Sequence, residues 1–442
     1  MQNKLKFGTD GIRGNADQYP FTENALKKLG KAIAKWSTFK YKKNNPKVLI
    51  GHDTRISCDR IKQALISGLK QYSLNIIDAQ VSPTPAICQL IQKTDLGFDF
   101  GIVISASHNP YKDNGIKIFD KQDTKLNKTD EELIVDFFEE TNIEKTLETN
   151  SVKLWQDANS KYKKNILNFF EPNFMQNLKI VLDCANGATY KIAPEIFEEL
   201  GAQVITIANS PDGKNINKNC GALHPENLKK IVLKNNADIG FAFDGDGDRL
   251  IAVNQDGEIL DGDDILALLL THPKFKDIKK LVGTIMTNHG LELFLEKNDK
   301  QLIRTSVGDK YIAAKLASEN LLLGGETSGH IIMKDYINSG DGIFNALRIV
   351  QTAIITNNWK LKNFTKTPQI MLNLTVKHKR DLSIDPYKKI IAKHKKLLNL
   401  GRVVVRYSGT ENLLRVMVED IKETTAKDIA KKLAQELKLS LN

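Results

Sequence analysis

Three aspartates separated by single glycines form the segment with the clearest chemistry, Phe241-Ala-Phe-Asp-Gly-Asp-Gly-Asp-Arg249. Two like charges ~4 Å apart repel by about 4 kcal/mol at an effective dielectric constant of about 20, so three convergent carboxylates need a cation. Glycine lets the loop curl until the carboxylates converge, and their oxygens are ligands for Mg²⁺ or Ca²⁺. An EF-hand is excluded because, counted from Asp244, Arg249 and Gln255 stand where that loop has Gly and Glu. A solvated acidic turn is the alternative, but the apolar flanks favour a metal site.

A second segment, Ser105-Ala-Ser-His-Asn-Pro110, follows the apolar run 100–104. Proline disfavours helix at the residue before it, so the chain leaves the predicted strand extended or turned. A hydroxyl beside His108 then lies at the carboxyl end of a strand, where α/β proteins bind ligands. Taken alone, a Ser/Asn turn that satisfies its own backbone is the more common interpretation. The segment is not the G-x-S-x-G elbow, which disfavours an α/β-hydrolase.

The third segment, Gly324-Gly-Glu-Thr-Ser-Gly-His330, lies between the apolar runs 321–323 and 331–333. Its Glu, Ser and His side chains offer hydrogen-bond donors and acceptors close to backbone. That combination suits a polyhydroxylated ligand. An ordinary hairpin turn explains the segment equally well.

The fourth segment, Arg406-Tyr-Ser-Gly-Thr-Glu-Asn412, follows Arg402-Val-Val-Val and precedes Leu413-Leu-Arg-Val-Met. Hydroxyls, approachable backbone N–H groups and the guanidinium forks of Arg406 and Arg415 form an anion-binding nest. A plain Ser/Thr turn competes with this interpretation. The two arginines favour phosphate.

These loops require elements that hold them at strand ends. An apolar strand, a small-residue loop and a helix recur in that order three times, starting at Lys47, Lys179 and Leu281. Such alternation predicts three related α/β modules with largely parallel strands. Helical spacing is found over 26–36 after Thr22 and in a stripe through Ile429, Leu433 and Leu437. Thr129-Asp-Glu-Glu132 predicts a capping box for another helix. Polar stretches at 143–160 and 355–368 indicate boundaries.

Composition limits the class of protein. The 442 residues, 41% hydrophobic and 26% charged, fit three or four globular domains. The net charge is +11, but only ten of the 64 basic residues are Arg, and the dense run 377–396 lacks interleaved aromatics. A solvated lysine-rich surface explains that run better than a nucleic-acid site. Neither a membrane span nor a signal peptide is indicated, and the four cysteines lack C-x-x-C spacing. We expect a cytoplasmic protein of a reducing compartment.

In this order, the four segments resemble those of the α-D-phosphohexomutase superfamily over essentially the whole chain. Gly8-Thr-Asp-Gly-Ile-Arg-Gly14, Ser105–Pro110 and Gly325–His330 look most like its bacterial phosphoglucosamine mutase branch. The resemblance implies an α/β, heart-shaped protein with three related modules of mixed sheets, a smaller α+β C-terminal domain and a central active-site cleft. The implied domains are 1–153 with the phosphoserine loop, 154–257 with the metal loop, 258–365 with the sugar loop and 366–442 with the phosphate loop.

The resemblance also implies roles for individual residues. Ser107 would be phosphorylated, and Asp244, Asp246 and Asp248 would hold Mg²⁺ with the phosphoserine oxygen. The remaining roles are sugar binding by Glu326 and Ser328, phosphate binding by Arg406, Ser408, Gly409, Thr410 and Arg415, and proton transfer or charge stabilisation by His108, Lys117, Arg13, Arg249 and His330. Asn412 departs from the Pro common in the family, and no role is carried over for His289.

The implied reaction interconverts glucosamine 6-phosphate and glucosamine 1-phosphate through a 1,6-bisphosphate, with one Mg²⁺ per subunit, and supplies the UDP-N-acetylglucosamine pathway. A phosphosugar is the expected partner of a monomer or homodimer, without nucleic acid or membrane. Two alternatives stay open. A phosphomannomutase/phosphoglucomutase typically has Met at the position of Thr327. A non-catalytic phosphosugar or nucleic-acid binder has no need of Ser107 beside three aspartates.

Overall fold

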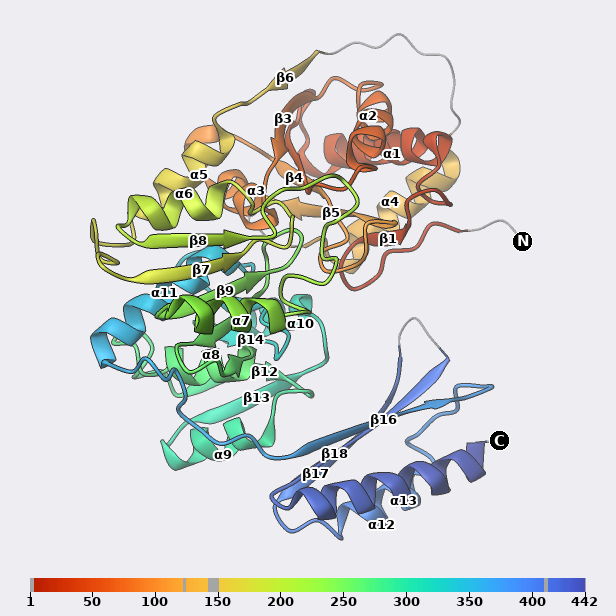
Figure 1. Cartoon of the computed structure of the whole chain (residues 1–442). Helices are drawn as coiled ribbons and strands as arrows, with labels where there is room; N and C mark the ends of the chain where they lie inside the picture. Colours follow the sequence, from red (N-terminus) through yellow and green to blue (C-terminus); the bar gives the residue numbers. More distant parts are fainter. Residues whose placement is uncertain (1–3, 122–124, 142–150, 409–411, 442) are drawn as a thin grey trace.

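The computed structural model describes residues 4–121, 125–141, 151–408 and 412–441. Four sheets follow one another along the chain, each with its own helices (Figure 1). The first three sheets are mixed and the last is antiparallel. This is the predicted architecture of three α/β modules and a smaller C-terminal module. Within the described residues, no helix combines the length and the apolarity that crossing a bilayer requires.

The first module has the strand order β1-β5-β4-β2-β3-β6, in which β2, β3, β4 and β6 are parallel and β5 is antiparallel to β4 and β1. The strands are β1 (Ile12–Asn15), β2 (Lys47–His52), β3 (Asn75–Val81), β4 (Phe100–Ile104), β5 (Asp113–Asp120) and β6 (Val152–Leu154). The helices are α1 (Glu23–Tyr41), α2 (Cys58–Leu69), α3 (Thr84–Gln92) and α4 (Lys128–Glu140), with a 3₁₀ turn at Thr94–Leu96. Helix α1 covers the predicted stretch 26–36.

The capping box predicted at Thr129 is wrong. Helix α4 begins earlier, and the side chain of Asn127 caps it by accepting from the backbone N of Asp130. An Asn side chain caps as well as Thr does, so two overlapping cap signals competed and the earlier one was used.

The second module has the order β11-β10-β9-β7-β8. Strands β9, β7 and β8 are parallel, whereas β10 is antiparallel to β9, so the three aspartates occupy the connection of a hairpin. The elements are α5 (Ala158–Leu167), β7 (Lys179–Asp183), α6 (Ile192–Glu199), β8 (Gln203–Ile207), α7 (Glu226–Asn235), β9 (Ile239–Phe243), β10 (Leu250–Asn254) and β11 (Ile259–Leu260).

The third module has the order β13-β12-β14-β15, with only β15 antiparallel. It comprises α8 (Gly262–Leu269), β12 (Lys280–Thr284), α9 (His289–Lys297), β13 (Gln301–Thr305), α10 (Asp309–Ser318), β14 (Leu323–Gly325), β15 (Ile331–Met333) and α11 (Gly342–Thr356). The C-terminal module has the order β16-β18-β17. Its elements are β16 (Gln369–Thr375), α12 (Tyr387–Lys395), β17 (Gly401–Tyr407), β18 (Leu413–Asp420) and α13 (Glu423–Leu441), and α13 buries the predicted stripe.

The cores of the modules are not all separate. One apolar cluster runs through the second and third modules, including Phe241 of β9, Leu266 of α8 and Phe344 of α11. The C-terminal module has its own cluster, whose buried members come mainly from α12, β18 and α13, with β16 packed against it. Its link to the third module is polar: the guanidinium of Arg402 donates to the carbonyls of Ile285 (2.6 Å) and Thr287 (2.5 Å). Figure 1 shows this module at the lower right of the view, beside α9 and β13 of the third module.

Candidate active site

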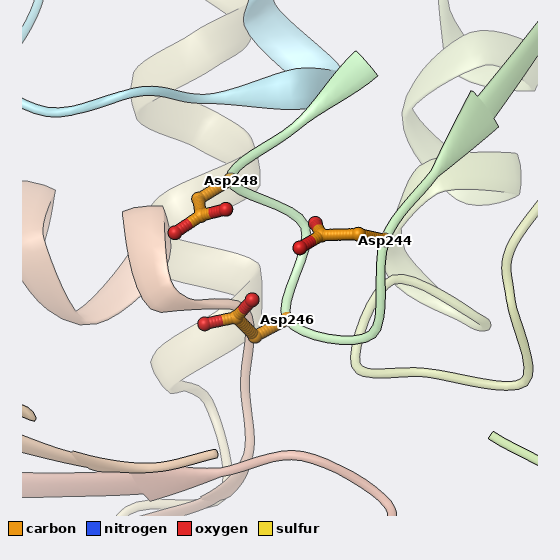
Figure 2. Close-up of side chains that lie close together, drawn as sticks. All are labelled: Asp244, Asp246 and Asp248. Atoms are coloured by element: carbon orange, nitrogen blue, oxygen red, sulfur yellow. The ribbon is translucent and has the colours of Figure 1, made fainter. Parts of the chain in front are cut away.

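The three aspartates of the β9–β10 connection converge. Asp244, Asp246 and Asp248 are buried, and one carboxylate oxygen from each lies within 4.8 Å of the other two. Figure 2 shows the carboxylates on one loop, facing a common point. Oδ1 of Asp246 and Oδ1 of Asp248 are buried without a hydrogen-bond partner among the described residues. Buried, unsatisfied carboxylate oxygens in this arrangement fit the coordination of Mg²⁺.

Electrostatics supports the same interpretation. Burial raises the pKa of Asp244 well above its usual range, and the charges of Asp248 and Asp246 raise it further. Burial also opposes ionisation of Asp248, but Lys117, His330 and Arg249 together outweigh burial and lower the pKa of Asp248 well below its usual range. The protein's own cations therefore neutralise one side of the cluster and leave Asp244 in need of a positive charge.

Ser107 meets the aspartate loop from the first module. Its hydroxyl donates to Oδ2 of Asp244 (2.5 Å) and lies 3.2 Å from Nδ1 of His108. A Cβ on Gly245 would come within 2.5 Å of the carbonyl oxygen of Ser107, so glycine is required for this approach. Burial lowers the pKa of His108 to about 3, and the guanidinium groups of Arg249 and Arg13 act in the same direction. The His108 ring beside the serine hydroxyl is therefore neutral at pH 7.

Lys117 lies on β5, the strand that follows the serine loop. Its ammonium contacts Asp246 (2.8 Å), Asp248 (3.1 Å) and Asp10 (3.4 Å). Burial disfavours this charge, but the three carboxylates outweigh it and raise the pKa of Lys117 well above its usual range. Lys117 is thus a permanent cation at the aspartate triad.

His330 is the last residue of the turn between β14 and β15. The third segment is therefore a hairpin turn that also presents functional groups. Nδ1 of His330 lies 3.7 Å from Asp248 and Nε2 lies 3.6 Å from Asp309. Burial by itself lowers the pKa of His330, but the carboxylates of Asp248, Asp309 and Glu326 raise it above its ordinary value.

These contacts close into a ring of alternating charges drawn from three modules. Lys125 completes it by pairing with Asp309 (2.5 Å) and with Asp10. We call this set the charge ring: Asp10, Lys117, Asp248, His330, Asp309 and Lys125. Sequence reasoning missed Asp10, Lys125 and Asp309. Asp10 stands in the opening glycine motif, which was a usable signal, whereas nothing local marks Lys125 or Asp309.

The remaining predicted residues surround this centre. Oε1 of the buried Glu326 accepts from the backbone N of Gly308 (3.0 Å), whereas Ser328 is exposed. Arg13 pairs with Asp10, and the backbone N of Arg249 donates to Asp244 (3.1 Å). The sheets thus bring the serine, the aspartates, the two arginines, Lys117 and His330 together, with Glu326 on the adjoining turn.

The fourth segment is the β17–β18 hairpin of the C-terminal module. Arg406 and Arg415 stand opposite each other across the two strands. Burial lowers the pKa of Arg406, and the charge of Arg415 lowers it further, so the pair favours binding an anion. Lys379 is exposed, as expected for the lysine run, and donates to the carbonyl of Ser408 (2.7 Å). Gly409 and Thr410 lie outside the described residues.

Comparison with protein families accounts for the whole arrangement. Four phosphoglucomutase/phosphomannomutase models match in sequence order: α/β/α domain I over residues 4–145, domain II over 160–257, domain III over 261–368 and the C-terminal domain over 371–436. The chain belongs to the phosphoglucomutase/phosphomannomutase family. It is therefore an isomerase of the phosphohexomutase type, as the resemblance of its four loops implied.

Curated relatives cover nearly the full chain. A phosphoglucosamine mutase of Syntrophus aciditrophicus is 42% identical over 449 residues, covering 98% of this chain and 99% of the relative. One from Aliarcobacter butzleri is 42% identical over 429 residues, covering 93% and 94%. One from Acinetobacter baumannii is 41% identical over 440 residues, covering 97% of each.

Solved structures show the same fold at low identity. A Burkholderia thailandensis phosphoglucomutase/phosphomannomutase family protein superposes with a TM-score of 0.78 at 22% identity, covering 98% of this chain and 97% of that one. The Aspergillus fumigatus N-acetylphosphoglucosamine mutase, solved with GlcNAc-6P and magnesium, superposes with a TM-score of 0.65 at 16% identity, covering 100% and 96%. The phosphohexomutase fold is thus confirmed by neighbours remote in sequence.

The structure shows the contacts of Asn412, which departs from the family pattern, and of His289, to which the sequence analysis assigned no role. The carbonyl of Asn412 accepts from the backbone N of Val376 (3.0 Å), which ties the end of the β17–β18 hairpin to the chain after β16. We call this hairpin the phosphate hairpin, after the ligand that the sequence predicts for it. His289 begins α9, where its ring lies 3.0 Å from Glu292 and its backbone N donates to Glu419 (3.4 Å). His289 therefore belongs to the joint with the C-terminal module.

Proposed function

We propose that this isomerase interconverts glucosamine 6-phosphate and glucosamine 1-phosphate, with Ser107 as the phosphorylated residue and the 1,6-bisphosphate as intermediate and activator. One observation carries the proposal: the Ser107 hydroxyl donates to a buried carboxylate of a convergent aspartate triad. The substrate follows from relatives about two-fifths identical over nearly the whole chain, which are phosphoglucosamine mutases.

Asp244, Asp246 and Asp248, with the Ser107 phosphoryl oxygen, would hold one Mg²⁺ per subunit. When bound, the ion neutralises charge on the phosphoryl group and on the aspartates. In each transfer the P–Oγ bond of phosphoserine breaks as a sugar oxygen bonds to phosphorus, and the proton of the sugar hydroxyl ends on Ser107 Oγ. The reverse transfer, from the other end of the bisphosphate, restores phosphoserine. Positioning and fixed charges account for most of such catalysis.

The chain supplies those charges. Lys117, Arg13, Arg249 and His330 are assigned to charge stabilisation and proton transfer around the moving phosphoryl group. His108, neutral and within hydrogen-bonding distance of Ser107 Oγ, is assigned to orient that hydroxyl.

Substrate binding is assigned to two other loops. Glu326 and Ser328 would bind sugar hydroxyls. Phosphate binding is assigned to the fourth segment: Arg406, Ser408, Gly409, Thr410 and Arg415. This one phosphate site must accept either end of the sugar. A C-terminal module joined through polar contacts is suited to that task. We propose domain boundaries close to residues 153, 257 and 365; β6 (Val152–Leu154) still pairs with the sheet of the first module, and β11 (Ile259–Leu260) with that of the second.

The test measures both the phosphoenzyme and the sugar. The intact mass of the purified protein should show one phosphate, located on Ser107 by peptide mapping. Values of kcat/KM should be compared for glucosamine, glucose and mannose 6-phosphates, each with its own 1,6-bisphosphate. The value of kcat/KM should be highest for glucosamine 6-phosphate. Activity on glucose 6-phosphate should still be measurable, because exchanging one hydrogen-bonding group of the sugar for another gives only modest discrimination. A lead of about tenfold for glucose or mannose phosphate, about 1.4 kcal/mol, would assign the chain to phosphomannomutase/phosphoglucomutase.

A further inference from the structure

Ser107 has an unfavourable backbone. Its φ of 52° lies in the left-handed region, which residues with a side chain rarely adopt. Such a conformation persists only when the surrounding structure fixes it in several places. The source of that restraint is the segment at the end of β2, Gly51-His-Asp-Thr-Arg55, to which the proposed reaction assigns no role.

The planar guanidinium group of Arg55 donates hydrogen bonds to the backbone of the serine loop. The side chain is buried, with 2% of the residue exposed. One terminal nitrogen donates to the carbonyls of Ser107 (2.9 Å) and Asn109 (2.8 Å). The other donates to the carbonyls of Asp113 (3.1 Å) and Pro110 (2.5 Å). Four carbonyls of one loop therefore converge on a single guanidinium group.

The N–H side of Ser107 is held as well. Its backbone N donates to Oγ of Ser105 (2.9 Å), and that hydroxyl donates to Oδ2 of Asp53 (2.6 Å). The same carboxylate oxygen accepts from Nε of Arg55 (2.8 Å). Asp53 thus joins the two restraints, so both polar backbone groups of Ser107 depend on the Asp53–Arg55 pair.

The second module adds one more restraint. The amide nitrogen of Asn217 donates to the carbonyls of Ser107 (2.9 Å) and Asn109 (3.1 Å). These are the two carbonyls that Arg55 also reaches through one nitrogen. Asn217 supports the loop from the side of the aspartates, although it is only partly buried.

We propose that Arg55 is a positioning residue for phosphoryl transfer, which holds the Ser107 loop so that Oγ points at Asp244. This inference rests on the proposed role of Ser107. None of the Arg55 contacts above involves the sugar or phosphate loops. Its loss should therefore slow transfer to and from Ser107 and leave substrate binding nearly unchanged. Small displacements of a reacting group cost about 100-fold in rate, which sets the scale of the effect.

The experiment compares Arg55→Lys with Arg60→Lys. Lysine keeps the charge but loses the fork, and Arg60, nearby on α2, donates to the carbonyls of Phe21 (3.0 Å) and Ala16, outside the serine loop. Dephosphorylated enzyme is mixed with glucosamine 1,6-bisphosphate, and the rate of phosphate transfer to Ser107 is followed by mass. Melting temperature, kcat and KM are measured alongside.

Arg55→Lys should lower the loading rate and kcat at least about 30-fold, with KM within about threefold of the unmutated value. In Arg60→Lys, the loading rate, kcat and KM should each stay within about threefold of the unmutated values. Unchanged loading in Arg55→Lys, an equal loss in Arg60→Lys, or a loss confined to KM would overturn the inference. If Arg55→Lys does not fold, Asn217→Ala decides: it should slow loading at least about fivefold without lowering the melting temperature, and unchanged loading would count against the inference.

The unmutated enzyme separates this inference from the proposed function. If it takes no phosphate on Ser107, the proposed function is wrong, and the proposed role of Arg55 is wrong as well. If it loads Ser107 and the Arg55 variant loads equally fast, only the inference is wrong.

Discussion

The aspartate loop and the phosphate hairpin are attached to the molecule in different ways. The aspartate loop lies between strands whose residues belong to one apolar core shared by the second and third modules. The phosphate hairpin belongs to a module with a separate core, joined to the third module by Arg402 and backbone carbonyls. An apolar core resists displacement because moving its parts exposes surface to water. A polar joint can exchange its hydrogen bonds with water. Under the proposed function, the fixed part would carry the phosphoryl transfer, and the separable part would bind a substrate that presents two ends.

The largest effect should come from the fixed part. Ser107→Ala should reduce turnover at least about 10³-fold, since nucleophile deletions in other enzymes cost that much or more. The variant should fold normally and carry no phosphate. The turnover of Ser105→Ala should fall much less, because this change weakens one restraint on Ser107 and removes no reacting group. A phosphopeptide that maps to Ser105 would contradict this assignment.

Metal removal tests the same part. EDTA should stop turnover and added Mg²⁺ should restore it. Asp246→Asn should need about 10–100 times more Mg²⁺ for half-maximal activity, as is usual when a metal site loses supporting groups. Asp256→Asn is the matched control, because Asp256 is exposed in the turn after β10. Full activity in chelator would remove the metal from the mechanism.

The separable part should give a smaller effect, seen in binding. Arg406→Lys keeps the charge but loses the bidentate fork, so kcat/KM should fall about 10-fold or more. Arg380→Lys serves as control, since Arg380 is exposed and only its backbone N contacts Tyr407 (2.9 Å). Kinetics of Arg406→Lys equal to those of the unmutated enzyme would exclude a phosphate role for this residue.

The joint itself should give the smallest change in catalysis. Arg402→Lys loses the fork that spans Glu419 and two carbonyls of the third module. We expect kcat to change by less than about threefold, whereas calorimetry should show the C-terminal module unfolding at a lower temperature than the rest. The carboxylate of Glu419 is fully buried, and in this variant it loses part of the positive charge and hydrogen bonding that Arg402 supplies, which should destabilise the C-terminal module. A single transition shifted as a whole would show that the joint is as rigid as the shared core.

Much of the site was predictable because its motifs are local. Each of the four segments follows a predicted strand, and the structure places three of the predicted strand ends around one centre. The helix cap at Asn127 was missed because two cap signals overlapped within three residues. Arg55, Lys125 and Asp309 were missed for a different reason. The Ser107 and Asp113 carbonyls that Arg55 binds lie 52 and 58 residues further along the first module, and the pairing of Lys125 with Asp309 depends on how the first and third modules dock. Asp309 lies 184 residues from Lys125, a distance that no periodicity or motif can bridge.

The serine hydroxyl and the carboxylate that accepts its hydrogen bond are 137 residues apart and come from different modules. A chain leaves the ribosome from its N-terminus, and its modules fold in that order. The first module can therefore complete its sheet while its serine still lacks all three aspartates. Until the chain is synthesised beyond β10 and the β9–β10 hairpin closes, Ser107 has none of these aspartates beside it, so the proposed transfer of phosphate from a sugar bisphosphate would have to wait for the second module. Under the proposed function, the enzyme can therefore become active only after the modules that carry Ser107 and the aspartates have both been synthesised, folded and docked.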